Sequence, residues 1–264
     1  MMNRMKTVLT AAALLPLALT GCAGEHEETA ASSYEDMQTA LAQSGLMSAT
    51  IGIFSKTEQG GGINYGDCGS GVIFEQADGK YYALTSAHVV SDENAQILVF
   101  TVNTDMKTET VPGLADMSIP SPDAYDAMYP AEKLYEAAEN DLAVICFAAE
   151  ETLSVMPLAE NDPAVGDRIL CLGHPENNWF AVSYGEVTSG IGVFGETQGY
   201  PSHAMRHSAY IKAGSSGGAA VNEQMQLTGI VPGGSFTPGS GKFRFGVLIP
   251  TSEIQRCLDE WRGQ

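Results

Sequence analysis

Short hydrophobic runs separated by turn residues recur along the chain from residue 47 to residue 250. Residues 49–54 alternate between apolar and small or polar side chains, as strands with one buried face do. Residues 69–74 and 81–86 flank an Ala-Asp-Gly-Lys turn at 77–80, and this arrangement predicts a β-hairpin. The other runs that predict strands are 95–102, 142–147, 169–172, 180–187, 188–193, 219–222, 227–231 and 243–250, and residues 209–213 lead into a turn. Strands joined by short turns, without long helical patterns between them, predict an all-β domain.

Helical patterns are predicted mainly at the two ends of this region. Ser33 can cap a short helix over residues 34–43, and a second helix spans 251–261. Residues 104–140 differ from the rest because they combine many acidic residues with four prolines. We expect an irregular insertion there, with a helical turn at 131–138. Such a surface loop either selects substrates or is a neutral decoration, and the sequence leaves both open.

The first 21 residues have the pattern of a signal peptide. A basic start is followed by an apolar run at 7–19, which is too short to cross a bilayer as a permanent helix. The run ends in Leu-Thr-Gly-Cys, which resembles the bacterial lipobox. That resemblance implies a lipid on the sulfur of Cys22 and an anchor to the cell membrane, facing outside the cytoplasm. A plain secretory signal is the alternative. Residues 22–46 would hold the lipidated cysteine, a flexible polar tether at 23–33 and the short helix.

Charge narrows the range of partners. The chain has 13 Lys and Arg against 32 Asp and Glu, which gives a formal charge of −19. Such a molecule repels nucleic acid, and the simplest interpretation is an acidic surface that keeps an exported protein soluble. Apart from Cys22, the cysteines are Cys68, Cys146, Cys171 and Cys257, and none forms a Cys-x-x-Cys pair. We therefore predict no metal site and no cofactor, and leave the disulfide pairing open.

Candidate chemistry centres on Ser216. Small residues on both sides let the backbone turn tightly, expose the hydroxyl and aim the N–H groups of Gly214 and Ser216 at one point, as an oxyanion hole requires. A serine nucleophile also needs a base and an acid that orients it. His88 follows a strand-like run, and Asp141 precedes one. Each feature alone is also typical of a tight loop, a core histidine or a turn aspartate, but the three occur together in a meaningful order.

Three segments carry a family resemblance: Thr-Ser-Ala-His-Val-Val at 85–90, Asn-Asp-Leu-Ala-Val at 140–144 and Gly-Ser-Ser-Gly-Gly at 214–218. Together they resemble the trypsin-like serine proteases, most closely the bacterial HtrA/DegP branch. The resemblance implies a protease domain at 47–264. Its fold would be two packed antiparallel six-stranded β-barrels, with a short N-terminal helix and a C-terminal helix.

The resemblance also implies where the catalytic groups lie. His88 and Asp141 would come from the first barrel and Ser216 from the second. HtrA relatives usually carry a PDZ peptide-binding domain after the C-terminal helix, and this sequence stops there, so capture of substrates by a PDZ domain is not expected.

The expected substrate pocket is formed by Tyr210, Ile230, Val231 and Pro232. By the resemblance, Tyr210 lies at the base of the primary pocket, which argues against a trypsin-like acidic pocket. The segment around Val231 is similar to the glutamyl endopeptidases, but Val231 replaces the histidine that they use. These residues favour small or medium apolar side chains. Ser215 departs from the Asn or Asp of relatives, but the turn acts through its backbone, so we expect activity to survive. HtrA relatives can also rest with a collapsed oxyanion hole, and the sequence does not decide whether this protein does so.

The sequence therefore predicts a serine endopeptidase that hydrolyses proteins or peptides at the cell envelope, with protein quality control as one context. Its partners would be polypeptide substrates and, through the lipid on Cys22, the membrane. The main alternative is a catalytically silent lipoprotein of protease fold that acts as a binding or chaperone module. An esterase is a third option, which the order His, Asp, Ser argues against. The physiological substrate and the oligomeric state do not follow from the sequence.

Overall fold

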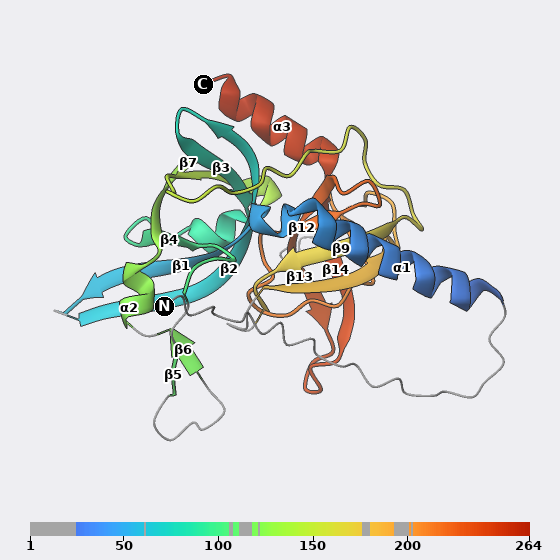
Figure 1. Cartoon of the computed structure of the whole chain (residues 1–264), viewed down its shortest axis with the longest axis horizontal. Coiled ribbons are helices and arrows are strands. Elements are labelled where there is room, and N and C mark those ends of the chain that lie inside the picture. The colour runs from blue at the N-terminus through green and yellow to red at the C-terminus, as the bar shows by residue number, and fades with distance from the viewer. Residues whose placement is uncertain are drawn as a thin grey trace, which may run out of the picture.

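The computed structural model describes residues 25–60, 62–105, 108–110, 118–120, 122–175, 180–192, 201 and 203–264. They form two β structures packed side by side, with the C-terminal helix α3 (Thr251–Arg262) above the place where they meet (Figure 1). The predicted signal peptide and Cys22 lie outside the described residues. Among the helices that the structure describes, none is long and apolar enough to cross a membrane.

The first β structure is a closed barrel in the strand order β1-β2-β3-β8-β7-β4, with antiparallel neighbours. Its strands are β1 (Thr50–Gln59), β2 (Gly62–Ala77), β3 (Lys80–Thr85), β4 (Gln96–Phe100), β7 (Tyr129–Ala137) and β8 (Leu142–Phe147). Strand β8 is apolar and buried at every position, because one face lines the barrel and α3 contacts it from outside. Such a fully buried strand is a firm support for the residue that precedes it, Asp141.

The second β structure is a six-stranded antiparallel sheet in the order β10-β9-β12-β13-β14-β11. Its strands are β9 (Arg168–Gly173), β10 (Ala181–Glu186), β11 (Met205–His207), β12 (Gly218–Val221), β13 (Leu227–Phe236) and β14 (Phe243–Pro250). A single antiparallel bridge between Val187 and His207 joins its two edges. The predicted all-β, chymotrypsin-like fold is therefore confirmed, with one closed barrel and one half-barrel.

One hydrophobic core runs through both β structures. Leu84 and Val144 of the barrel belong to the same buried cluster as Leu227 and Ile230 of the half-barrel. Helix α3 contacts β7 and β8 on one side and β13 and β14 on the other, so it bridges the two. Continuous burial of this kind holds the two halves in a fixed relation, as a site at their junction requires.

Three predicted elements were wrong. The run at 188–193 is not a strand over its described residues, 188–192, where only an isolated bridge joins Gly192 to Ala204. Residues 131–138 are not a helical turn, because Tyr129–Ala137 form β7, which pairs with β4 and β8. Three charged side chains in this strand hide its alternation. The N-terminal helix α1 (Glu25–Ser44) is also longer than 34–43, so most of the expected tether is helical.

The remaining elements are short. They are the two-stranded ribbon β5 (Thr108–Thr110) and β6 (Ser118–Pro120), helix α2 (Pro122–Asp126), and the 3-10 helices η1 (Leu46–Ala49), η2 (Ala87–Val90) and η3 (Ala138–Asn140). Cys146, Cys171 and Cys257 are free and buried. Helices η2 and η3 matter most, because they lead into or contain candidate catalytic residues.

Candidate active site

The barrel brings His88 and Asp141 into direct contact. His88 lies in η2, just after β3, and its Nδ1 is 2.8 Å from Oδ2 and 3.0 Å from Oδ1 of Asp141. The backbone N–H of His88 also donates to Asp141 Oδ1, at 2.9 Å. The carboxylate therefore contacts both the ring and the backbone of the histidine, which fixes the ring orientation and leaves Nε2 outside this contact.

Asp141 has an unusual backbone. Its φ is 51° and its ψ is 41°, in the left-handed region that few residues other than glycine adopt. The Asp141 carbonyl accepts a hydrogen bond from the N–H of Ala87, at 3.1 Å, and β8 follows at once. A strained conformation is kept only where its surroundings enforce it, and here it delivers the carboxylate to His88.

The contact changes the proton affinity of His88. The hydrogen bond to Asp141, together with the negative charge of that carboxylate, raises the pKa of His88 above its ordinary 6.5, against the opposing effect of partial burial. His88 and Asp141 side chains are 52% and 20% exposed, so the pair is reachable from solvent. A partly exposed imidazole of this kind can exchange protons with a bound substrate.

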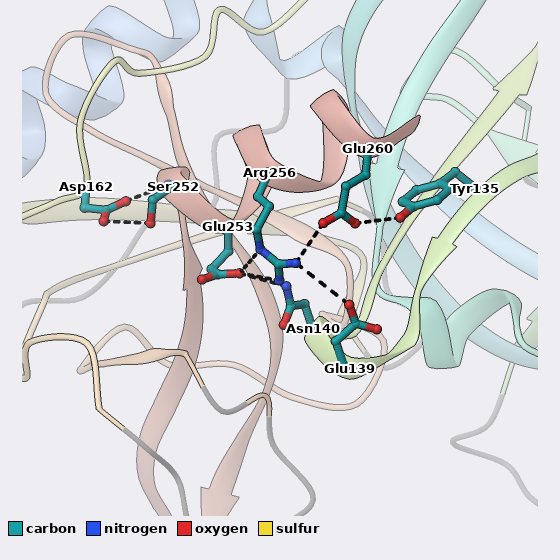
Figure 2. Close-up of polar contacts among 8 residues, drawn as sticks. All are labelled: Tyr135, Glu139, Asn140, Asp162, Ser252, Glu253, Arg256 and Glu260. Atoms are coloured by element: carbon teal, nitrogen blue, oxygen red, sulfur yellow. Dashed lines mark hydrogen bonds and ion pairs between the residues drawn. The ribbon is translucent and has the colours of Figure 1, made fainter. Parts of the chain in front are cut away.

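Helix α3 holds the segment before Asp141. The buried Asn140 donates from Nδ2 to Glu253 Oε2 at 2.7 Å, and Arg256 donates to the same oxygen at 2.8 Å (Figure 2). Arg256 Nη1 also lies 3.9 Å from a carboxylate oxygen of Glu139. Two consecutive residues ahead of Asp141 are thus tied to one helix.

The same helix is fixed at both ends. Asp162 accepts hydrogen bonds from the N–H and the hydroxyl of Ser252 at 2.7 and 2.8 Å, which places a carboxylate at the helix N-terminus. Near the C-terminus, Tyr135 of β7 donates to Glu260 at 2.7 Å, and this bond raises the pKa of Tyr135 to about 12 (Figure 2). Helix α3 therefore braces the acid of the site from outside the barrel.

The half-barrel supplies Ser216 on a tight turn. The N–H of Ser215 donates to the carbonyl of Lys212 at 3.0 Å, and Gly214, the third residue of this turn, has a φ of 90°. A positive φ at the third position is the mark of a type II turn. Among the described residues, the N–H groups of Gly214 and Ser216 have no hydrogen-bond partner within the protein. Two backbone donors are thus available for a ligand oxygen.

Ser70 of β2 connects this turn to the barrel. Its hydroxyl donates to the carbonyl of Gly214 at 2.7 Å, and its N–H donates to the carbonyl of Ser216 at 2.7 Å. The Ser70 hydroxyl also accepts from the N–H of His174, at 2.8 Å. Sequence reasoning missed this residue, and the available signal was a polar residue between two glycines, directly before the apolar run at 72–74.

Close packing brings the turn that carries Ser216 against the strand that leads to His88. A Cβ on Gly217 would come within 2.2 Å of the carbonyl oxygen of Ser70 and 2.9 Å of the N of Ser86. The Ser216 hydroxyl itself donates to the carbonyl of Pro232 at 3.0 Å. Within the described part of the chain no hydrogen bond joins it to His88, so the third contact of a triad is not made in this structure.

The four residues expected in the substrate pocket lie in different places. Tyr210 and Val231 line a cavity of about 170 Å³, together with Ser215 and parts of β9 and β10. Ile230 is buried in the core between the two halves, and Pro232 is the acceptor for Ser216. The cavity is lined by Lys212 and Ser215 of the turn that carries Ser216, but not by His88 or Ser216 themselves. The described residues contain no group of three or more His, Cys, Asp or Glu that could hold a metal ion.

Comparison with known proteins defines the class. A model of the trypsin-like peptidase domain matches residues 69–230, more than half of the chain. The chain belongs to this family.

Two HtrA-like serine proteases of Staphylococcus aureus, from strains MRSA252 and USA300, are 27% identical over 209 residues. The match covers 74% of this chain but only 23% of each relative, so the chain spans about a quarter of their length. The crystal structure of the serine endoprotease from Yersinia pestis has the same fold, with a TM-score of 0.60 and 24% identity over 85% of this chain and 66% of that one.

Proposed function

We propose that this protein is a serine endopeptidase in which His88, Asp141 and Ser216 form the catalytic triad. The observation that carries the proposal is the contact of 2.8 Å between His88 Nδ1 and Asp141, beside a type II turn that presents Ser216 and two uncommitted N–H groups. The arrangement satisfies the needs of a serine nucleophile: an oriented base, an acid behind it and donors for an oxyanion.

The reaction is hydrolysis of an amide. The Ser216 hydroxyl gives up its hydrogen bond to the Pro232 carbonyl. Its oxygen then attacks the carbonyl carbon of the substrate while His88 Nε2 takes the hydroxyl proton. The carbonyl oxygen becomes an oxyanion that accepts hydrogen bonds from the N–H groups of Gly214 and Ser216. His88 then gives the proton to the leaving amine, which produces an acyl-enzyme. Water, activated by His88, hydrolyses the ester and releases Ser216.

The half-barrel also offers a place for an extended substrate. Beyond Val231, which pairs with Gly218, strand β13 pairs with β14 alone among the described strands. A polypeptide can add to such an edge through backbone hydrogen bonds, so that its carbonyl reaches Ser216. This edge starts at Pro232, next to the nucleophile.

The cellular setting follows from the N-terminal sequence. Residues 1–21 act as a lipoprotein signal peptide, and a lipid on Cys22 anchors the domain at 47–264 to the cell membrane, outside the cytoplasm. The proposed substrates are polypeptides of the cell envelope, and protein quality control is the proposed context.

The test is labelling with a fluorophosphonate probe. The parent protein should be labelled on Ser216, and Ser216→Ala should remove the label and lower peptide turnover by several orders of magnitude. Ser215→Ala is the matched control, because it removes the neighbouring hydroxyl and should stay labelled. If Ser216→Ala cleaves at the parent rate, the assignment is wrong.

A second candidate is a catalytically silent protease-fold lipoprotein that binds other proteins. The observation in its favour is that the Ser216 hydroxyl bonds to Pro232 and not to His88. This second function would be supported if the well-folded parent protein takes up no probe at Ser216 and no added peptide restores the labelling.

A further inference from the structure

Charge is unevenly distributed between the two halves of the molecule. Residues 50–147, which contain the barrel, have four Lys and Arg against fifteen Asp and Glu. Residues 168–250, which contain the half-barrel, have five against four. Between 201 and 250 the only acid is Glu223, and Arg168 already pairs with it at 2.6 Å. The half that carries Ser216 is thus close to neutral, whereas the barrel half is strongly negative.

Two of these cations lie on the hairpin that extends β13 beyond the nucleophile. Ser235 pairs with Phe245 and Phe236 with Phe243, so Arg244 is an extra residue in β14, which makes a β-bulge. A bulge turns the side chain that it carries away from the regular direction of the strand. Arg244 and the nearby Lys242 are exposed, and neither has a carboxylate partner among the described residues.

Aromatic rings connect this hairpin to the nucleophile turn. Phe243 contacts Phe236 with ring centres 5.6 Å apart and Tyr210 with ring centres 5.3 Å apart. The Lys212 amine lies 5.9 Å from the centre of the Tyr210 ring, and Lys212 is the first residue of the turn that presents Ser216. Tyr210 and Phe236 are 50% and 37% exposed. We call this surface the cationic rim; it consists of Tyr210, Lys212, Phe236, Lys242, Phe243 and Arg244.

We infer that the cationic rim selects acidic polypeptide segments, which it holds beside the nucleophile. The inference rests on the proposed function and names its substrate class. Carboxylates pair with guanidinium and ammonium groups, and exposed rings pack against the carbon atoms of the bound segment. The rest of the molecule repels an acidic chain, so attraction is confined to the edge of β13, where cleavage would occur. This goes beyond the apolar preference expected from Tyr210 and Val231, because it concerns residues that flank the cleaved bond.

The test measures binding apart from turnover. In the Ser216→Ala background, two peptides of equal length are compared by fluorescence anisotropy with a neutral dye: one rich in Asp and Glu, the other with Asn and Gln in their place. The acidic peptide should bind about tenfold more tightly, and this preference should disappear in a variant with Arg244→Gln and Lys242→Gln. Lys80→Gln is the matched control, since Lys80 is an exposed cation of the barrel and its loss should leave the preference intact.

Failure of the inference and failure of the proposed function are distinguishable. Equal binding of the two peptides by a protein that labels normally with fluorophosphonate overturns the rim and leaves the protease. Preference for the acidic peptide without any labelling of the parent keeps the rim and overturns the protease. If both peptides bind alike while phosphatidylglycerol vesicles lose affinity in the Arg244 and Lys242 variant, the rim is a membrane contact and the inference is wrong.

Discussion

The barrel and the half-barrel hold the residues of the proposed triad in different ways. The barrel holds His88 and Asp141 by three side-chain contacts of 3.0 Å or less, and helix α3 braces the acid from behind. The half-barrel holds Ser216 through backbone geometry, on a glycine-rich turn to which Ser70 hydrogen-bonds. The Ser216 hydroxyl donates to the carbonyl of Pro232. In the proposed mechanism, the acid and base are thus in contact before substrate binds, whereas the Ser216 hydroxyl must still rotate toward His88.

Histidines in the two halves show the same contrast. Contact with a carboxylate raises the pKa of His88, whereas burial lowers the pKa of His174 and His207 to about 4. His207 is fully buried in the half-barrel, where its Nε2 has no hydrogen-bond partner in the described part of the chain. The barrel keeps at its surface a histidine whose pKa Asp141 raises, and the half-barrel keeps His174 and His207 neutral at pH 7. The histidine that transfers protons in the proposed mechanism is therefore the one held by a carboxylate, His88.

Asp141→Asn should cause the largest loss. The amide keeps the shape of the carboxylate but can present the wrong hydrogen-bonding group to His88 Nδ1, so kcat should fall about a thousandfold to ten-thousandfold. Steady-state kinetics on a peptide substrate measures the effect. Asp92→Asn, an exposed acid near the same helix η2, is the control and should retain parental kcat. Parental activity in Asp141→Asn would mean that the pair at 2.8 Å is structural only.

Gly217→Ala should break the half-barrel side of the site. The new methyl group would lie within 2.3 Å of both Ser70 O and Thr85 Oγ1, at a φ of 85°, so the turn must move. We expect a loss of at least about 3 kcal/mol in unfolding free energy and loss of fluorophosphonate labelling.

Gly239→Ala separates backbone strain from packing in that experiment. Its φ is 79°, but a Cβ there has nothing within 4 Å, so it should cost only about 1 kcal/mol and keep the label. Equal unfolding free energies for the two variants, measured in urea, would contradict the close approach of Gly217 to the barrel.

Glu253→Ala should have a smaller effect, through the position of Asp141. It removes the acceptor of Asn140 and the main partner of Arg256, so we expect kcat to fall about tenfold with KM little changed. The acid limb of the pH profile should also move to lower pH, because a displaced carboxylate raises the pKa of His88 less. Asp259→Ala, on the same helix, should change neither kcat nor the position of the acid limb. A loss of stability with an unchanged pH profile would limit α3 to a structural role.

The smallest expected effect is the pH dependence of the parent enzyme. His88 must be neutral to accept a proton, and Asp141 raises its pKa above 6.5, so kcat/KM should fall as the pH is lowered through that raised pKa. In Asp141→Asn the main causes of the upward shift are gone, and the limb of the residual activity should lie at lower pH. His203→Gln, an exposed histidine of the half-barrel, should leave the limb in place.

Local patterns explain what the sequence could predict. The segments around His88, Asp141 and Ser216 each contain the strand or turn that presents the residue, so the candidate residues and the fold followed from short stretches. The roles of these residues remain predictions until the variants are measured. The C-terminal helix was confirmed, because its apolar spacing and its start are encoded within its own residues.

Contacts between distant segments explain what could not be predicted. Ser70 and Gly214 are 144 residues apart, and Asn140 and Glu253 are 113 apart, so no local pattern links them. Strand β7 was missed because its alternation is weak: polar and apolar side chains along it are mostly half-buried or exposed. Its identity as a strand depends on its neighbours β4 and β8, which supply the hydrogen bonds.

Helix α1 sets the reach of the enzyme, if Cys22 carries the proposed lipid. Its 20 residues would span about 30 Å, and Met37 and Leu41 near its end are buried in the shared core. A helix joined to the core works as a strut, so the active site would stand at a set height above the bilayer instead of sweeping a wide volume. The distance from the membrane would then select substrates: polypeptides that extend as far as the active site would be cleaved, and those that stay close to the lipid would not.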